Sequence, residues 1–538
     1  MTTPDAATQR HATDWVALAA ITIGALATVL VVLPYRSFDL DRFLAPKELA
    51  VHVAAGIAGT VTLARARAVR ITRADVLLGA WLLLSIASAV FATNHWVGLR
   101  AVTLSVSGAV IYWSARRLAS AGLGGTLTAC LGGVVVIGAA TALLQAYGVK
   151  FNFATLSRAP GGTFGNRNFM AHLAAIGVPL LAWRALAAKR AVGSALAIAG
   201  LALCSGALVL SRTRAAWLAL ILVAIVALVL AARGPALVEP AQRRRGWLAM
   251  MAVIAGVALA LVVPNQLDWR SDNPYLDSVK GVVNYKEGSG RGRLKQYENS
   301  LKLSLRHPAF GVGAGNWPAQ YPAVAPSGDP SFAEATGMTA NPWPSSDWVA
   351  ALSERGVVAA LAWATFVLTL LGAGLRVRYD GARTSGVRLA AVAGVAALLL
   401  ASLEGLFDAV LLLPMPLIVT MAVAGALLPS GKEEGTLTFA APSRVMLPVL
   451  LLSAQVVASF AAAGRVEAMR LYTTGTVAGL EKASRQDPGS FRIQLRAADA
   501  QLARGNCAEA RLHATAARGL FPYAPGPKRV LAACPGKR

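Results

Sequence analysis

Residues 208–222 read LVLSRTRAAWLALIL, and in this stretch Arg212 and Arg214 stand between two long apolar runs. The runs extend over about 192–210 and 215–232, and each is long enough to cross roughly 30 Å of hydrocarbon as a helix. Charges beside a membrane span are costly unless they pair, snorkel to the headgroups or face a wet cavity. The stretch therefore predicts both a membrane fold and a candidate site.

The same pattern continues along the chain. Of its 538 residues, 56% are hydrophobic and only 14% are charged, against about 25% charged in soluble domains. These numbers exclude an ordinary soluble protein and predict an all-α, polytopic membrane bundle of about 12–13 transmembrane helices. The predicted spans lie near 15–35, 49–64, 75–92, 99–115, 124–147, 169–187, 192–210, 215–232, 247–263, 356–375, 389–406, 409–428 and 445–463.

The positive charges indicate how the chain is oriented. Arginine and lysine gather in alternate connections, as in Arg65–Arg73 and Arg243–Arg245, and such connections lie on the cytoplasmic side. The connection with Arg36, Arg42 and Lys47 is neutralised by Asp39, Asp41 and Glu48 and is assigned to the other side. The N-terminus is then cytoplasmic, and a long loop at 264–347 is external or periplasmic.

This orientation divides the chain into a transmembrane domain at 1–463 and an external tail at 464–538. The first apolar run lacks a small-residue cleavage site, so no cleavable signal peptide is expected. The net charge of +25 follows from topology and contact with anionic membrane lipids, and no nucleic acid partner is expected. The predicted location is the inner (plasma) membrane.

Three arginines lie on the external side, where topology gives no reason for them. Arg212 and Arg214 begin the eighth span, and Arg167 lies at the start of the sixth in GTFGNRNFMAHLAA (162–175). Single arginines also reach the headgroups by snorkelling, which is the alternative for any one of them. As a set, they predict a functional site.

The long external loop also has features of a functional segment. Gly288–Gly292 predict a tight turn, and Arg291 and Arg293 precede a helix that Pro308 ends. A helix N-terminus with arginines favours binding of phosphate oxygens. The stretch 323–342 reads as a lid or specificity segment. The helix is predicted from apolar residues at three- and four-residue spacing: Leu294, Tyr297, Leu301 and Leu305.

Four motifs together resemble the O-antigen ligase and polymerase superfamily of bacterial membrane glycosyltransferases. They are GTFGNRN, SRTR, RGRLKQYENSLKLSLRHPAFGVGAGNW in the long loop, and SSDWVAALSERGVVAAL at 345–361. Their order, spacing and sidedness carry the resemblance over about 150–450. The resemblance implies transfer of a glycan from polyprenyl pyrophosphate to an acceptor hydroxyl outside the membrane. The acceptor in this superfamily is a lipid A–core sugar, a second lipid-linked glycan or a protein side chain.

The resemblance also assigns roles to residues. Paired external arginines bind the donor pyrophosphate, and they fall on Arg212 or Arg214 and on Arg291 or Arg293, with Arg167 nearby. No cofactor is expected, and the enzyme is predicted to be metal-independent and inverting. The residues expected to contact substrate come from the first, third and fourth motifs: Asn166, Asn168, Trp317, Ser345 and Ser346.

The fourth motif departs from the superfamily pattern. Many members have His-Asn where this chain has Ser345 and Ser346, and a serine hydroxyl is a poor proton acceptor. Asp347 or Glu354 takes the catalytic role, or the reaction proceeds with little base assistance, or the chain uses another acceptor. His172 and His307 are further candidates, each expected to be structural.

Other functions fit the sequence less well. A polymerase that lengthens a lipid-linked glycan is the nearest alternative to a ligase, because the four motifs do not separate the two. A transporter of lipid-linked glycans is less favoured, since it requires charges along a path through the spans. Glu404 and Asp408 are the only clustered acids in the spans, and both fall at an external boundary.

The tail changes character. Residues 487–522 resemble one tetratricopeptide-type helical hairpin, with a preceding helix expected at about 466–484. Cys507 and Cys534 can pair in an oxidising compartment and compensate for a small core. The tail is then either a generic basic appendage or a docking site for a polysaccharide-assembly protein.

Overall fold

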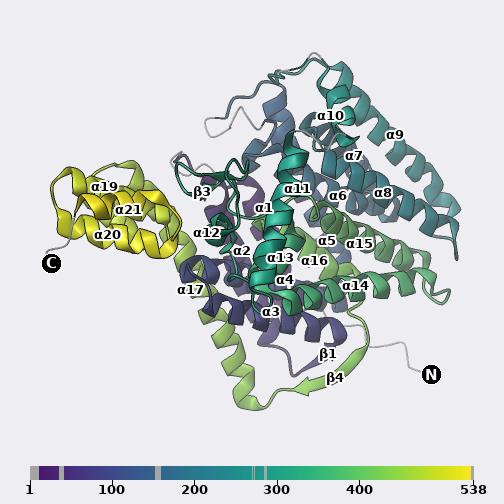
Figure 1. Ribbon diagram of the computed structural model, residues 1–538. Helices are drawn as coiled ribbons and strands as arrows, with labels where there is room; N and C mark the ends of the chain where they lie inside the picture. The colour runs from purple at the N-terminus through teal and green to yellow at the C-terminus, as the bar shows by residue number, and fades with distance from the viewer. Residues whose placement is uncertain are drawn as a thin grey trace.

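The computed structural model describes residues 11–35, 41–151, 159–269, 271, 273–283 and 288–534. Helices dominate these residues and form a bundle from which the C-terminal helices extend to one side (Figure 1). Eleven of the described helices are long and apolar enough to cross a membrane, which confirms the predicted fold class. They are α1 (Ala12–Leu30), α3 (Arg73–Val90), α4 (His95–Ser120), α5 (Gly124–Ala146), α6 (Arg167–Ala187), α7 (Ala191–Ser211), α8 (Arg214–Ala232), α9 (Pro240–Val262), α14 (Val357–Tyr379), α15 (Ser385–Glu404) and α17 (Ala441–Thr473).

The other two predicted spans are also helices, but they do not meet the same standard. The first, α2 (Asp41–Leu63), begins with charged residues that the sequence placed in a loop. That expectation is wrong for Arg42, Lys47 and Glu48, which lie in the helix and are buried. Glu48 is accommodated because it pairs with two arginines, Arg100 at 2.8 Å and Arg465 at 3.0 Å. Arg36 and Asp39 fall outside the described residues.

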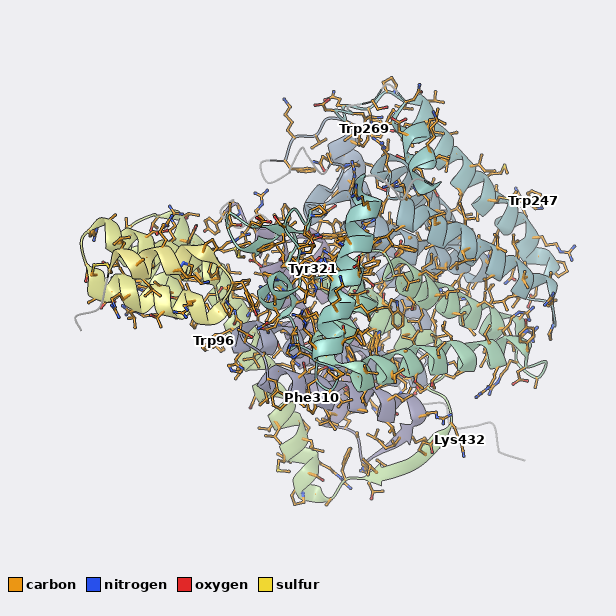
Figure 2. The ribbon with its side chains drawn as sticks, viewed as in Figure 1. Trp96, Trp247, Trp269, Phe310, Tyr321 and Lys432 are labelled. Atoms are coloured by element: carbon orange, nitrogen blue, oxygen red, sulfur yellow. A yellow bond between two sulfur atoms is a disulfide. The ribbon has the colours of Figure 1, made fainter. Side chains whose placement is uncertain are left out.

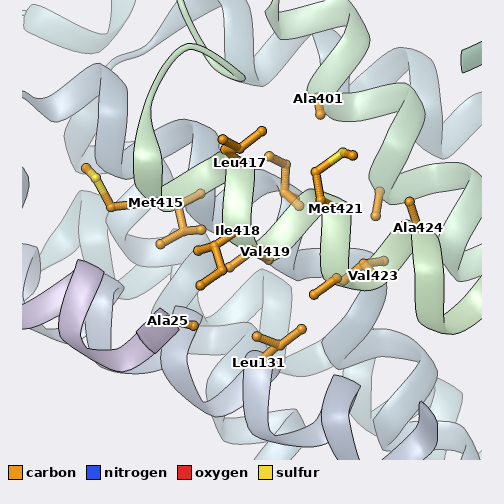
Figure 3. Close-up of a cluster of buried hydrophobic side chains, with 14 of the residues drawn as sticks. Ala25, Leu131, Ala401, Met415, Leu417, Ile418, Val419, Met421, Val423 and Ala424 are labelled. Carbon is orange, nitrogen blue, oxygen red and sulfur yellow. The ribbon is translucent and has the colours of Figure 1, made fainter. Parts of the chain in front are cut away.

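The second exception, α16 (Pro414–Leu427), has only 14 residues because it lies in the middle of the bundle. Its side chains are buried on every side, as expected for a helix that is apolar all round. Figure 3 shows Met415, Ile418 and Met421 of α16 packed among side chains from neighbouring helices, including Leu131 of α5 and Ala25 of α1.

Two small antiparallel sheets were not predicted from the sequence. In one, β1 (Ala68–Thr72) pairs with β4 (Glu433–Thr438), with Ala68 opposite Thr438. This sheet joins the connection after α2 to the connection before α17 (Figure 1). In the other, β2 (Phe332–Ala333) pairs with β3 (Met338–Thr339) inside the long loop, within the stretch expected to be a lid.

The long loop is largely helical. It contains α10 (Pro274–Val283), α11 (Gly288–Arg306), the short α12 (Trp317–Gln320), a 3₁₀ turn η3 (Tyr321–Ala323) and α13 (Asp347–Arg355). The predicted helix is present as α11, but the turn predicted over Gly288–Gly292 is wrong, because these residues form its first turn.

The buried face of α11 is not the one that the apolar spacing predicted. Of the four residues behind that prediction, Leu294, Leu301 and Leu305 are 54%, 52% and 72% exposed, and Tyr297 alone is partly buried. The opposite face is buried although it is polar, because the surrounding loop supplies hydrogen-bond partners, as Asp329 does for Asn299 at 2.9 Å. Its buried polar residues are Gln296, Asn299, Ser300 and Ser304.

The tail is helical, as predicted. The boundary expected at 463/464 falls inside α17, which continues to Thr473 before α18 (Val477–Gln486), α19 (Phe491–Ala503), α20 (Cys507–Leu520) and α21 (Pro525–Ala533). Cys507 and Cys534 are joined by a disulfide with their Cα atoms 5.4 Å apart. The hairpin expected at 487–522 corresponds to α19 and α20, which pack against each other.

Candidate functional site

A polar cavity of about 240 Å³ lies where the long loop meets the ends of α6 and α15. Four segments contribute to it: the start of α6, α11, the loop before α13, and the loop between α15 and α16. The cavity is lined by Asn166, Arg167, Asn168, Phe169, Arg293, Asn341, Trp343, Ser345 and Asp408. It therefore brings together five of the residues predicted from sequence: Arg167, Arg293, Asn166, Asn168 and Ser345.

The GTFGNRN motif forms the start of α6 at this cavity. A 3₁₀ turn, η2 (Gly162–Phe164), is followed by Gly165 in the left-handed conformation with φ of 69°. A side chain there would collide with the ring of Phe43, so glycine is needed for both reasons. Asn166 then caps the helix by accepting a hydrogen bond from the backbone N–H of Asn168 at 3.0 Å. The positive end of the α6 dipole therefore lies at the cavity and favours an anion.

Arg293 reaches the cavity because α11 is fastened to two other segments. The Tyr297 hydroxyl donates to the carbonyl oxygens of Ser345 at 2.7 Å and Leu406 at 2.8 Å. The Gln296 side-chain oxygen accepts from the Ser345 N–H at 2.6 Å. Burial raises the pKa of Tyr297, so its hydroxyl remains a donor at neutral pH. Arg293 lies one turn earlier on the same face of the helix.

Among the described residues, Asp408 is the one carboxylate in the cavity lining. Its Oδ2 accepts from the Asn168 side-chain nitrogen at 2.9 Å and lies 3.6 Å from Nη2 of Arg293. Its Oδ1 accepts from the Ala409 N–H at 2.9 Å. Burial alone would raise the pKa of Asp408, but the nearby His172 and the charge of Arg293 lower it below its ordinary value. Asp408 is therefore an ionised hydrogen-bond acceptor.

Beneath the cavity, His172 lies between two carboxylates. Its Nε2 is 3.5 Å from Asp408 Oδ2, and its Nδ1 is 3.4 Å from Glu404 Oε1. All of this histidine and all of Glu404 are buried. The sequence suggested a structural role for His172, and its place beneath the lining is compatible with holding Asp408. Neither acid was assigned to the site from sequence.

The SRTR arginines lie beside the cavity without lining it. Arg212 ends α7 with φ of 54°, and its Nε donates to the Ser278 hydroxyl of α10 at 2.8 Å. Its guanidinium lies 4.7 Å from the ring centroid of Trp269, and that of Arg167 lies 5.7 Å from the same ring. Trp269, labelled beside α10 in Figure 2, thus links the two motifs. Arg214 donates to the carbonyl of Gly281.

The remaining predicted residues have other surroundings. Arg291 is exposed and is absent from the cavity lining. Trp317 is buried in the core of the loop, where its Nε1 donates to the Ser300 hydroxyl at 2.9 Å. Glu354 is buried and accepts from the Gly315 N–H at 2.9 Å. Ser346 caps α13 and donates to the Gly405 carbonyl at 2.9 Å.

Asp347 holds the loop that carries Asp408. Its Oδ1 accepts from the Val410 N–H at 3.0 Å, and its Oδ2 accepts from the Leu411 N–H at 2.8 Å. Burial raises the pKa of Asp347 to about 7, and the backbone hydrogen bonds limit the increase. Because backbone groups occupy both oxygens and Asp347 does not line the polar cavity, the geometry favours a positioning role for this residue.

We expect Asp347→Asn to destabilise the protein. The substitution replaces one carboxylate oxygen, which now accepts a hydrogen bond from a backbone N–H, with an amide nitrogen whose own N–H groups would face that donor. Leaving a buried donor unsatisfied costs about 1–3 kcal/mol. The measurement is the thermal unfolding midpoint of the purified protein in detergent. Asp268→Asn is the matched control, because Asp268 is exposed and outside the cavities described here. Equal midpoints for the two variants would contradict the positioning role.

The fold and the cavity together define a multi-pass membrane protein with a polar cavity whose lining includes Arg167 and Arg293. Residues 199–364 match the family model described as O-Antigen ligase. This match covers less than half of the 538-residue chain, so it shows what this part of the chain is similar to. No curated protein matches the chain. The matched stretch includes Arg293 and Ser345, whereas Asn168 and Asp408 lie outside it.

Proposed function

We propose that the protein transfers a glycan from polyprenyl pyrophosphate to an acceptor hydroxyl on the external face of the membrane, as a ligase of O-antigen type. The observation that carries this proposal is the polar cavity, where Arg167, Arg293 and the N-terminus of α6 surround a single carboxylate, Asp408. Two arginines and a helix N-terminus suit a pyrophosphate. The carboxylate is suited to accept the proton of the acceptor hydroxyl.

In the proposed reaction, the acceptor oxygen attacks the anomeric carbon and the bond from that carbon to the pyrophosphate oxygen breaks. The bonding electrons pass to the departing oxygen, where negative charge grows. Arg293 and Arg167 stabilise this charge without rearranging, which is usually the largest catalytic contribution. Asp408 takes the acceptor proton. One displacement inverts the anomeric centre.

Arg212 and Arg214 act around this centre. Arg212 and Arg167 contact the same Trp269 ring, so Arg212 adds positive charge beside the phosphate site and orients Arg167. Arg214 fastens α10 through Gly281. The members of each arginine pair suggested by the sequence are therefore proposed to differ in role. Arg293 is favoured over Arg291 for direct contact with phosphate. Arginines supply the charge stabilisation, so the reaction is proposed to be metal-independent.

A polymerase of the same family is the second candidate. Ser345 lines the cavity where many ligases have histidine, so the acceptor surroundings differ from those of typical ligases. In a polymerase, the acceptor is a second lipid-linked glycan, and the same arginines and carboxylate serve the same chemistry.

The test is transfer by the purified full-length protein in proteoliposomes supplied with polyprenyl-pyrophosphate glycan and lipid A–core, with a chelator present. We expect glycan on lipid A–core, detected by mass spectrometry, with an inverted linkage by NMR. Extension of the polyprenyl-linked glycan would instead identify a polymerase. Absence of both products from folded protein would contradict the proposed function.

A further inference from the structure

A second cavity, of about 680 Å³, lies between the tail and the bundle. It is bounded by α4, α17, the connection from α18 to α19, and the loop around β3. Its volume falls within the roughly 300–1,000 Å³ typical of small-molecule sites. Trp96, which is 53% exposed, marks this junction beside the tail in Figure 2.

This tail-walled cavity lies directly behind the polar cavity. Gly165 lines the tail-walled cavity and its neighbour Asn166 lines the polar one. Likewise, Ala340 lines the tail-walled cavity and Asn341 lines the polar cavity. Two separate segments therefore form a common partition that is one backbone thick. The two cavities are placed to hold two substrates whose reacting ends meet.

A third, mainly apolar cavity of about 160 Å³ adjoins both of them. It shares Pro342 with the tail-walled cavity and Trp343 with the polar cavity. Consecutive residues of one loop thus border all three spaces.

The lining of the tail-walled cavity is amphiphilic. Its bundle side carries exposed apolar residues on membrane-spanning helices, including Leu99 of α4 and Val457 of α17. The lining also carries four arginines and two aspartates, and Arg100 and Arg465 among them also pair with Glu48: Arg100, Arg465, Arg485, Arg492, Asp41 and Asp487. An apolar wall under an excess of arginine suits a lipid that carries an anionic head.

The tail is firmly seated, so it can serve as a wall of this cavity. The Asn94 side chain donates to the Gly489 carbonyl at 3.0 Å. Phe491 and Phe521 of the tail pack with Ala319 of the long loop, and Ile493 packs in a cluster with Ala45 of α2. The tail therefore contacts α2, α4 and the long loop.

The geometry points to the tail-walled cavity as the acceptor site, which binds a saccharide carried on an anionic lipid while the polar cavity holds the donor pyrophosphate. This inference rests on the proposed transfer reaction. It gives the tail a part in substrate selection. The anionic lipid is lipid A–core in a ligase or a second polyprenyl-pyrophosphate glycan in a polymerase, and both present phosphate to the arginines.

Reversing one charge tests the inference. In proteoliposomes, Arg485→Glu should raise the acceptor KM about tenfold while kcat and the donor KM stay within about twofold, because repulsion acts on acceptor phosphate alone. The acceptor is varied in two arms, lipid A–core in one and polyprenyl-pyrophosphate glycan in the other, and the arm that responds identifies its source. Arg504→Glu is the matched control, because Arg504 is an exposed tail arginine that does not line the cavity.

A second variant fills the part of the tail-walled cavity that α17 lines. Ala461→Trp places a large ring in the cavity from α17, whereas Val449→Trp on the same helix does not, because Val449 does not line it. Only the first should weaken binding of fluorescent lipid A–core or fluorescent polyprenyl-pyrophosphate glycan, measured with Arg293→Ala present to prevent turnover.

The outcomes separate the inference from the proposed function. Unchanged acceptor KM and unchanged binding of both probes in Arg485→Glu and Ala461→Trp would overturn the acceptor site even if transfer occurs. Equal effects of test and control variants would also overturn it. Wild-type protein could also bind either probe, with weaker binding in Arg485→Glu, and still transfer no glycan. That result would contradict the proposed transfer reaction and support the tail-walled cavity as a lipid-binding site.

Discussion

Arg293→Ala should lower glycan transfer about 10²–10³-fold, which is the usual effect of removing one preorganised charge-stabilising group. Arg293 lines the polar cavity and lies 3.6 Å from Asp408, so it is placed beside the developing pyrophosphate charge. The measurement is the initial rate of transfer in proteoliposomes, normalised to the amount of folded protein. Arg293→Lys should recover only part of the rate, because lysine cannot make the bidentate contact.

Arg291→Ala provides the matched control two residues earlier on the same helix. Arg291 is exposed and does not line the cavity, so its loss should change the rate by less than about twofold. Similar losses for Arg291→Ala and Arg293→Ala would show that α11 contributes only diffuse positive charge. Full activity of Arg293→Ala would remove the proposed phosphate clamp.

Asp408→Asn should lower kcat about 10²–10⁴-fold, the range in which a positioned general base contributes. The donor KM should change much less, because the arginines that bind the donor remain. The substitution keeps the approximate shape of the side chain but removes its negative charge and its basic oxygen. Single-turnover measurements with donor and acceptor both saturating separate this loss from weaker binding.

The pH profile gives an independent test of Asp408. The pKa of this carboxyl is lowered, so the wild-type group stays ionised until the pH falls below the ordinary value for aspartate, near 3.9. The contribution of Asp408 to the rate should therefore be constant from about pH 8 to pH 5. The variant should instead speed up with rising pH, as hydroxide replaces the missing base. A flat profile in the variant would argue against proton transfer to Asp408.

The membrane bundle was predictable because a long apolar run in the sequence has few structural alternatives to a membrane-spanning helix. Each of the thirteen predicted segments corresponds to a helix. The exceptions to regular behaviour came from long-range contacts: the buried Glu48 of α2 pairs with Arg100 of α4 and Arg465 of α17, far along the chain. The sheet of β1 and β4 likewise joins distant connections, and neither strand has a strong pattern alone.

The site was predictable only in part. The arginine motifs indicated residues that line or adjoin the polar cavity, but the choice between Arg291 and Arg293 depends on how α11 is rotated. Apolar spacing suggested the wrong face, because Tyr297 and Gln296 bind backbone groups of other segments. Their three- and four-residue spacing from Arg293 was the available signal. Asp408 could not be assigned, since Asn168 and His172 approach it only after folding.

The pairing of α2 with α17 has a consequence for biogenesis. Glu48 enters the bundle early in translation, but Arg465, one of its two cationic partners, follows only in α17, just beyond the last predicted span at 445–463. The β1 strand must likewise wait for β4. A nascent chain at the translocon thus carries an incompletely neutralised acid and an open strand edge until insertion is almost complete. Membrane proteases and chaperones can recognise such a chain as unfinished, which couples synthesis of the tail to survival of the whole protein.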